Sequence, residues 1–344
     1  MASHSNYQTI RAESLDPALY EDPSPGIPRL SRASFITAMS RAFDLAENRD
    51  QGHAQRVAYI GLELGADAGL DPESLQHVFF ACLLHDVGTA ASPLPFTGEA
   101  GNGPRIFAGA TSAAELLASV PRGGWADAIR AVRVHCEQGA RIAGELGLPD
   151  PVADAIHGHH DCWDGSGMPG VFPGESASAV TRIVAAADRI ESLIAIDGSP
   201  LTIRRRIAGL IEEMSGSEIE PGLARRIVEV TSRDQFWLGL YETDLATGLM
   251  ANQVDEPMAP AEFFECAAVI GDIVDVRTGR DSGRGRRVGD LAHRLAIDAG
   301  LGARRADLVK LAALLQDIGT LGVPVELLHK PDILTIEEMA IMQQ

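Results

Sequence analysis

The chain has 344 residues, which is long enough for two or three domains and a large hydrophobic core. Hydrophobic residues make up 45% of it and aromatic residues only 5%, a balance that favours helices over sheets. The formal net charge of −19 argues against binding to nucleic-acid polymers or anionic membranes, although a bound metal could still attract a small phosphate ligand. The four cysteines lack CxxC spacing and the N-terminus lacks an apolar signal segment, so we expect a reduced, cytoplasmic setting.

The sequence of the first half of the chain predicts a flexible tail followed by helices. Residues 1–30 are polar and rich in proline, which is typical of a loose N-terminal tail. Helical periodicity begins near Ser34, and residues 52–69 place apolar side chains on one helical stripe. A further helix is expected over 72–84, because Asp71 is a suitable N-cap before a proline at the first helical position.

Later segments show one long loop and two further helix starts. Residues 89–111 are rich in glycine, proline and small side chains, which predicts a long loop. Asp150 is the expected cap of a helix that Pro151 opens. Thr335 and Glu338 have the spacing of a capping box.

The chain also contains an internal repeat. Residues 83–89 read LLHDVGT and residues 314–320 read LLQDIGT. With a shift of 231 residues, 52–89 aligns with 283–320 without a gap, and 15 of the 38 positions are identical. A repeat of this length predicts a duplicated domain rather than a small solenoid unit.

The two copies differ at the histidines. His53 aligns with Arg284, and His85 aligns with Gln316. A His-Asp pair that follows an apolar helix can bind a metal, whereas a Gln-Asp pair is a much weaker site. The first copy is therefore the expected metal site.

Histidines and carboxylates recur through the first copy. A single histidine on an apolar helix is more often a core residue than a ligand, but imidazole and carboxylate together suit first-row divalent metals. The residues in this pattern are His53, His85, Asp86, His135, His157, His159, His160 and Asp188.

Three motifs together resemble the HD-GYP family of the HD metal-dependent phosphohydrolase superfamily. HDVG at 85–88 resembles the HD-x-G core of that family, and HHDCWDGSGMPG at 159–170 resembles its HHE-x-x-DGxGYP signature. RIVAAAD, which ends at Asp188, resembles the next metal-binding element. The resemblance covers roughly 34–240 and returns over 255–344.

The resemblance implies an all-α fold, an HD-type helical bundle that is present twice. A metal-binding domain is expected over 31–250 and a degenerate, partial second copy over 255–344. Two or more divalent transition metals are implied, with Fe, Mn, Ni, Co or Zn as candidates. The implied ligands are His53, His85, Asp86, His135, His159, His160 and Asp188.

Roles for single residues follow from the same resemblance. His85 and Asp86 are implied as catalytic, and the Asp86 carboxylate can bridge two ions. Asp164, Gly165, Gly167 and Arg182 are the implied substrate-binding residues.

The HH pair sets a condition on the local structure. Helical spacing alone pairs His157 with His160, at i and i+3. The family pattern instead pairs His159 with His160, which requires the helix to end or distort there. We expect His157 to lie beside the ligands or on the surface.

The sequence also departs from the family pattern. Thr89 stands where lysine is common after HD-x-G, and Met168 replaces the tyrosine of GYP. The acid after the histidine pair is Asp161 rather than glutamate. Residues 90–134 do not resemble the usual family segment. The implied metal ligands are thus complete, whereas the groups that recognise cyclic di-GMP are partly missing.

The expected function is a metal-dependent phosphohydrolase of HD-GYP type. It would act as a phosphodiesterase on cyclic di-GMP or a related nucleotide through metal-activated water. The alternatives are a non-catalytic regulatory module that binds metal or nucleotide, and an HD phosphohydrolase that acts on another nucleotide.

The second copy is expected to be a scaffold without metal. Arg284 places a cation where a ligand would stand, and Gln316 offers only a neutral amide, so Asp317 is left as a single carboxylate. Because the apolar positions are kept, this copy can serve a homodimer or a partner domain. The repeat stops at Gln344, where family members continue, which suggests a truncated chain or a partner that covers it.

Overall fold

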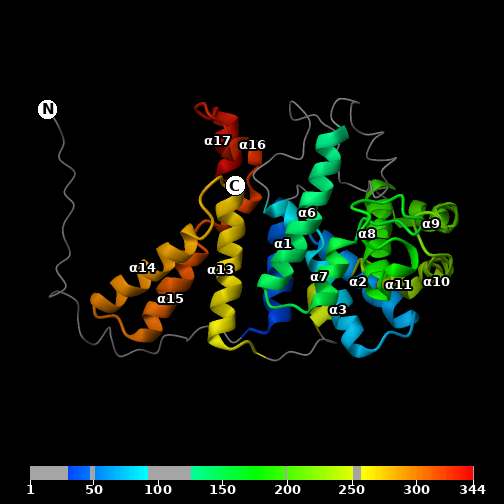
Figure 1. Cartoon of the computed structure of the whole chain (residues 1–344), viewed down its shortest axis with the longest axis horizontal. Helices are drawn as coiled ribbons and strands as arrows, with labels where there is room; N and C mark the ends of the chain where they lie inside the picture. Colours follow the sequence, from blue (N-terminus) through cyan, green and yellow to red (C-terminus); the bar gives the residue numbers. More distant parts are fainter. Residues whose placement is uncertain (1–29, 47–50, 92–124, 198–199, 251–256, 344) are drawn as a thin grey trace.

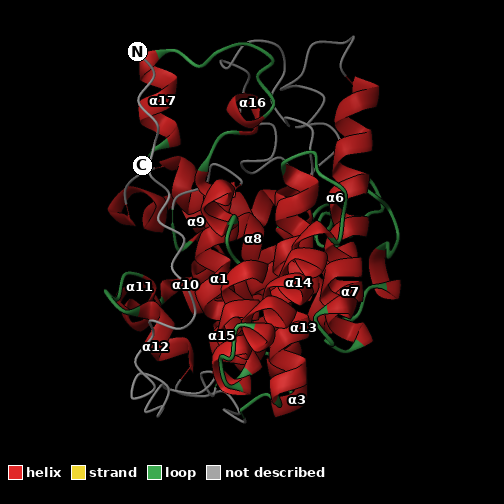
Figure 2. Ribbon diagram, turned by 90° about the vertical axis from the view of Figure 1, so that its left-hand side faces the viewer, coloured by secondary structure: helices red, strands yellow, loops and turns green. Residues whose placement is uncertain are grey.

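The computed structural model describes residues 30–46, 51–91, 125–197, 200–250 and 257–343. Every regular element in these ranges is a helix, and β pairing is limited there to two isolated bridges, Ser31 with Pro257 and Ser215 with Ile219 (Figure 2). The predicted all-α fold is confirmed.

The helices that carry or adjoin the predicted ligands form one bundle together with a helix that precedes them (Figure 1). They are α1 (Arg32–Ala46), α2 (His53–Asp67), α3 (Pro72–Leu84), α4 (Val87–Ala90), α6 (Trp125–Glu145), α7 (Asp150–His157) and α8 (Ala179–Asp197). α1 packs against α2, α3 and α4, α2 packs against α3 and α8, and α7 packs against α3, α6 and α8. The apolar stripe predicted for the second helix lies in this core, where Val57, Ile60 and Leu64 are fully buried.

Helix ends agree with the predicted caps at two of three places. Asp71 Oδ1 accepts a hydrogen bond from Ser74 N at 2.8 Å, so α3 begins as expected. Thr335 and Glu338 form the reciprocal capping box. The expectation for Asp150 was wrong, because this residue is already the first of α7 and Pro149 holds the cap position without a side-chain bond.

The helix α7 ends just before His159 and His160, as the pairing of these two histidines required. The helix stops at His157, and Gly158 follows as its C-cap. His159 and His160 therefore lie in the turn after the helix, so both rings can face the bundle interior.

The remaining helices form an outer layer and a C-terminal part. The outer elements are η4 (Gly174–Ser176), α9 (Pro200–Met214), α10 (Pro221–Ser232), α11 (Asp234–Leu240) and α12 (Leu245–Met250). The C-terminal elements are α13 (Pro260–Arg277), α14 (Arg284–Asp298), α15 (Ala303–Leu314), η5 (Ile318–Gly322), α16 (Val325–Leu328) and α17 (Ile336–Met342). α14 and α15 pack against each other and lie beyond α13 on the side away from the ligand-bearing bundle (Figure 1).

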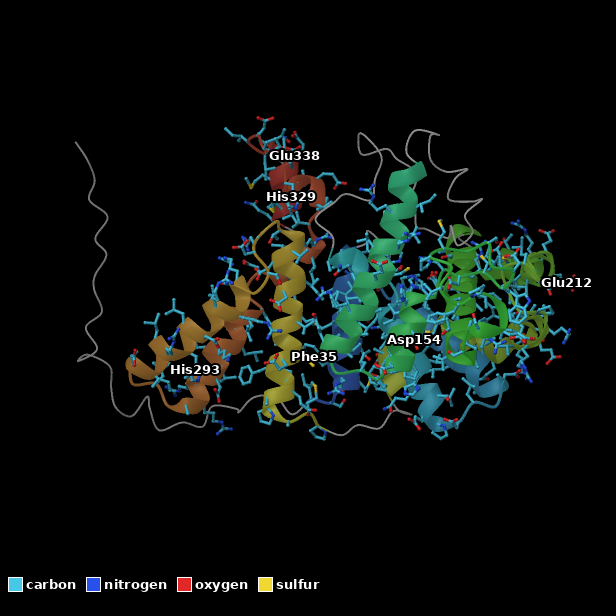
Figure 3. All side chains as sticks on the ribbon, viewed as in Figure 1. Phe35, Asp154, Glu212, His293, His329 and Glu338 are labelled. Atoms are coloured by element: carbon cyan, nitrogen blue, oxygen red, sulfur yellow. The ribbon has the colours of Figure 1, made fainter. Side chains whose placement is uncertain are left out.

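One apolar core joins the bundle to α13. The ring of Phe35, which Figure 3 labels, meets that of Phe263 on α13 edge to face, with the ring centres 5.6 Å apart. Ile270 and Ile273 of α13 are 1% and 2% exposed, and they belong to the same buried cluster as the first bundle. The C-terminal part is therefore packed onto the ligand-bearing part.

The repeated segments adopt corresponding helices. α14 begins and ends 231 residues after α2, and η5 begins 231 residues after α4. Gly52 and Gly283 precede α2 and α14 with φ of 89° and 80°, a left-handed conformation that glycine adopts without steric cost. The duplication itself stays a prediction from the sequence.

Two predicted segments fall largely outside the described residues. The N-terminal tail at 1–29 and most of the expected loop, 92–111, are among them. The described beginning of this segment is not loop, since Thr89 and Ala90 lie within α4.

Across the described helices, none combines the length and apolar character that a membrane span requires.

Candidate metal centre

The seven predicted ligands come from five places in the bundle and lie at one buried centre. His53 is the first residue of α2, His85 and Asp86 join α3 to α4, and the others lie on α6, after α7 and on α8. All seven residues are buried, and Asp86, the most exposed of them, has an exposed fraction of 7%. Helix packing thus brings together residues that are 135 positions apart in the chain, from His53 to Asp188.

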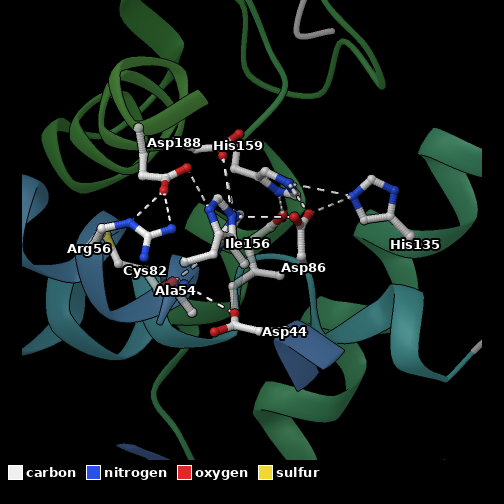
Figure 4. A network of polar contacts seen from close by, with 12 residues as sticks. Asp44, Ala54, Arg56, Cys82, Asp86, His135, Ile156, His159 and Asp188 are labelled. Atoms are coloured by element: carbon white, nitrogen blue, oxygen red, sulfur yellow. Dashed lines mark hydrogen bonds and ion pairs between the residues drawn. The ribbon is translucent and has the colours of Figure 1, made fainter. Parts of the chain in front are cut away.

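Asp86 lies between histidines on both of its sides (Figure 4). Its Oδ1 is 3.5 Å from His135 Nε2 and 3.3 Å from His159 Nε2. Its Oδ2 is 3.3 Å from His85 Nε2. A carboxylate with one oxygen toward each group of imidazoles is suited to bridge two metal ions.

The first group consists of His53, His85 and Asp86, and the Asp188 carboxylate lies beside its two histidines. Asp188 Oδ1 is 3.8 Å from His53 Nε2 and 3.5 Å from His85 Nε2, and the two Nε2 atoms are 3.3 Å apart. One ligand atom each from His53, His85 and Asp86 lies within 4.8 Å of the others. These distances leave room for a common ion between the nitrogen and oxygen atoms.

The second group contains His135, His159 and His160, together with Cys136. Their ligand atoms also lie within 4.8 Å of one another. Both ring nitrogens of His160 are buried and, among the described residues, neither has a hydrogen-bond partner. An unsatisfied buried polar group costs about 1–3 kcal/mol, and a metal ion would remove this cost. The residues therefore fit a metal.

Backbone carbonyls orient two of the ligands. His85 Nδ1 is 2.8 Å from the carbonyl oxygen of Cys82, and His159 Nδ1 is 2.6 Å from that of Ile156. Each Nδ1 donates to its carbonyl, so each Nε2 faces the centre, where a metal would displace its proton and take its lone pair.

The charges at the centre shift the pKa values in opposite directions. Burial lowers the pKa of His85, but Asp86 outweighs it and holds that pKa well above its usual value. Burial raises the pKa of Asp86, yet His85 and His135 hold it well below its usual range. Burial, followed by the nearby His159, lowers the pKa of His160, which keeps this ring neutral and able to donate a lone pair to a metal.

Sequence reasoning missed Glu191, which holds His53 in place. Glu191 Oε2 is 2.6 Å from His53 Nδ1, and Oε1 accepts from Arg56 Nε at 2.7 Å. The available signal was its spacing, because Glu191 follows Asp188 by three residues on α8 and so shares its face. Cys136 was missed as well, although it directly follows His135.

Replacing Glu191 by glutamine is expected to weaken metal binding. The variant removes the negative charge that orients His53 and leaves Arg56 without its ion-pair partner. Loss of such an outer partner lowers metal affinity by roughly 10–100-fold. Chelator competition would measure this, with Glu212→Gln on the exposed face of α9 as the matched control (Figure 3). Equal affinities for the two variants would contradict the assigned role.

The glycine of the HD-x-G motif allows two helices to approach. A Cβ on Gly88 would lie 1.9 Å from the His135 carbonyl oxygen and 2.7 Å from Gly139 N. Such distances are not tolerated, so only glycine permits α4 to cross α6 this closely. The crossing brings His135 to Asp86.

The loop after the histidine pair is organised by Asp161. Its carboxylate accepts hydrogen bonds from the backbone nitrogens of Gly170, Val171 and Phe172 at 2.6, 2.9 and 2.7 Å. The shorter acid thus still folds the loop back on itself. His157 packs against Phe172 at the half-buried edge of this loop and belongs to neither ligand group, as expected.

The predicted substrate-binding residues lie in and beside the same loop. Asp164 and Gly165 are exposed, whereas Gly167 packs so tightly that a Cβ would lie 2.2 Å from Cys162 N. Arg182 donates to Glu220 at 2.6 Å and lies over the ring of Trp163. Their substrate role stays a prediction.

Comparison with known proteins agrees with the fold and the centre. The family model described as HD domain matches residues 51–193. A solved structure of a cyclic GMP-AMP specific phosphodiesterase of Vibrio cholerae, V-cGAP3, superposes with a TM-score of 0.66 at 23% identity, covering 91% of this chain and 77% of that one. The all-helical, HD-type bundle is thereby confirmed.

Two proteins are also similar to this chain in sequence. The 3′3′-cGAMP-specific phosphodiesterase 3 of Vibrio cholerae is 24% identical over 342 residues, which cover 90% of this chain and 73% of the relative. The cyclic di-GMP phosphodiesterase of Thermotoga maritima is 37% identical over 83 residues, which cover 24% of this chain and 22% of that protein.

Fold and centre agree with these comparisons, because the region that resembles an HD domain contains the buried histidines and carboxylates that could hold metal ions. Over residues 51–193 the chain is similar to the HD domain family, and over most of its length it is similar to phosphodiesterases named for 3′3′-cGAMP.

Proposed function

We propose that this chain is a metal-dependent phosphodiesterase of HD-GYP type whose substrate is 3′3′-cGAMP or a related cyclic dinucleotide. The observation that carries the proposal is the position of Asp86 between two groups of buried histidines. Such a centre would hold two ions, which together would activate a water molecule and a phosphodiester for hydrolysis.

The ligand residues prepare the centre for hydrolysis. When bound, divalent ions supply Lewis-acid activation of a phosphoryl group and of the attacking water. Asp86 would compensate the charge of both ions, while His85 and His159 are held by backbone carbonyls with Nε2 toward the centre. Burial of these residues excludes bulk water, which strengthens their electrostatic effect on the phosphate.

The comparisons support 3′3′-cGAMP as the first substrate to test. Two relatives named for this nucleotide align over 90% and 92% of the chain, whereas a third aligns over 22% and the one named for cyclic di-GMP aligns over 24%. Thr89 in place of lysine and Met168 in place of tyrosine also favour a substrate other than cyclic di-GMP.

An open pocket beside His159 supports a role for Arg182 in substrate binding. Trp163, Phe172 and Arg182 are among the residues that line it. Aromatic faces and a guanidinium are surfaces on which a nucleobase stacks. A base of the substrate would bind here, above the loop that contains Asp164.

The C-terminal part, 255–344, is proposed to be a degenerate second copy that acts as a scaffold. Asp317, the counterpart of Asp86, pairs with Arg280 and Arg284. Gln316 is exposed, unlike the buried His85. Guanidinium groups thus pair with the carboxylate that corresponds to Asp86.

The outer face of α14 supports a role for this copy in assembly. Leu291 and Leu295 are 52% and 59% exposed, whereas their counterparts in α2, Ile60 and Leu64, are fully buried. A homodimer or a partner domain could cover these side chains.

The test is turnover by the purified chain after anaerobic loading with Fe(II), Mn(II), Ni(II), Co(II) or Zn(II). We expect more than one metal per chain and conversion of 3′3′-cGAMP to the linear dinucleotide, with slower cleavage of cyclic di-GMP. Elemental analysis measures the metal content, and chromatography of the products measures the conversion of each nucleotide. Chelator-treated protein is the control. A loaded chain that binds the nucleotide without cleaving it would instead identify a regulatory module.

A further inference from the structure

The thiol of Cys136 lies within the second ligand group. Its Sγ is 3.7 Å from His135 Nε2, and the side chain is fully buried. The sulfur and one ring nitrogen each of His135, His159 and His160 all lie within 4.8 Å of one another. A metal placed among the three imidazoles would therefore have sulfur within reach.

His160 gives an independent indication that a ligand belongs at this point. The residue is 3% exposed, and neither of its ring nitrogens has a hydrogen-bond partner among the described residues. Its ring centre is 3.9 Å from that of His159 and 5.0 Å from that of His135. Two unsatisfied nitrogens in a ring surrounded by other imidazoles point to an ion.

The other cysteines do not share this arrangement. All four are buried, which is usual for a small apolar side chain. Cys82 packs against α2 at Gly61, and Cys266 has Met258 Sδ at 3.9 Å. Neither belongs to a ligand group in the described part of the chain. Cys136 is thus set apart by its neighbours rather than by its burial.

We propose that Cys136 is a thiolate ligand of the metal held by His135, His159 and His160. The thiol proton passes to solvent as the sulfur–metal bond forms. The two groups then differ in kind, since the first offers imidazole and carboxylate while the second adds a soft sulfur donor. A soft donor selects metals that bind thiolate well, such as zinc or iron, over manganese or magnesium. This inference rests on the proposed metal-dependent function and deepens it.

Cobalt(II) loading tests the proposal, because a thiolate on cobalt produces a charge-transfer band in the near ultraviolet. We expect this band in the cobalt-loaded wild-type chain and in Cys266→Ala, the matched control. Cys136→Ser should lose the band and bind the metal of this group more weakly, by roughly 10-fold or more. Circular dichroism checks that each variant folds.

X-ray absorption on the zinc-loaded wild-type chain needs no variant. A sulfur scatterer at about 2.3 Å is expected beside the nitrogen ligands. Cobalt or zinc bound without a sulfur signal would overturn the role of Cys136 and leave the proposed function standing. A wild-type chain that takes up neither metal would overturn both.

Discussion

Replacing Asp86 by alanine is expected to abolish phosphodiester hydrolysis and to lower the metal content of both groups. The carboxylate faces His85 with one oxygen and His135 and His159 with the other. Without it, each ion loses a ligand and the charge that compensates it. We expect turnover to fall by more than about 100-fold, the scale on which loss of one charge-stabilising group acts.

The internal repeat offers a matched control for this variant. Asp317 stands 231 residues after Asp86 and forms partly exposed ion pairs with Arg280 and Arg284. Such pairs contribute about 0–1 kcal/mol to the free energy of unfolding. The Asp317→Ala protein should therefore have the metal content and the turnover of the wild-type chain. Elemental analysis and rate measurements on both variants would decide. Equal loss in the two, or full activity in Asp86→Ala, would place the chemistry elsewhere.

Replacing Gly88 by alanine is expected to force α4 and α6 apart. The new methyl group would lie 1.9 Å from the carbonyl oxygen of His135, and a backbone atom cannot rotate away as a flexible side chain can. Overpacking of this kind lowers the free energy of unfolding by about 1–3 kcal/mol. Because His135 moves with α6, the second ligand group should also lose metal.

Gly319 is the matched control, at the corresponding position of the second copy. A Cβ there would meet no atom within 4 Å. Gly319→Ala should therefore leave the unfolding midpoint and the metal content unchanged, or raise the midpoint slightly by restricting the unfolded chain. Denaturant titration of both variants measures the difference. A Gly88→Ala protein as stable and as metal-rich as Gly319→Ala would show that the close crossing is not required.

Local features of the sequence determined much of the fold. Pro72 and Asp71 define the start of α3 because a helix begins where its first backbone amides find a partner nearby in the chain. Composition and apolar periodicity favoured helices for a similarly local reason, whereas the all-helical bundle was implied by the family resemblance. The same reasoning was wrong at Asp150, where the proline before it holds the cap position.

The sequence also identified the residues of the centre as candidates. The His-Asp and His-His pairs can be recognised in the sequence, because each pair comes from one short segment. The structure brings all seven predicted ligands into one buried region. The motif did not say how they divide into two groups, since that depends on which oxygen of Asp86 faces which ring.

Only the tertiary structure decided what surrounds the ligands. Glu191 reaches His53 across 138 positions of sequence, because α8 packs on α2. Cys136 joins its group because α6 crosses α4 at Gly88, and the thiol then lies beside rings from the end of α7. Contacts between helices are set by how whole apolar faces pack, and no short stretch of sequence records that geometry.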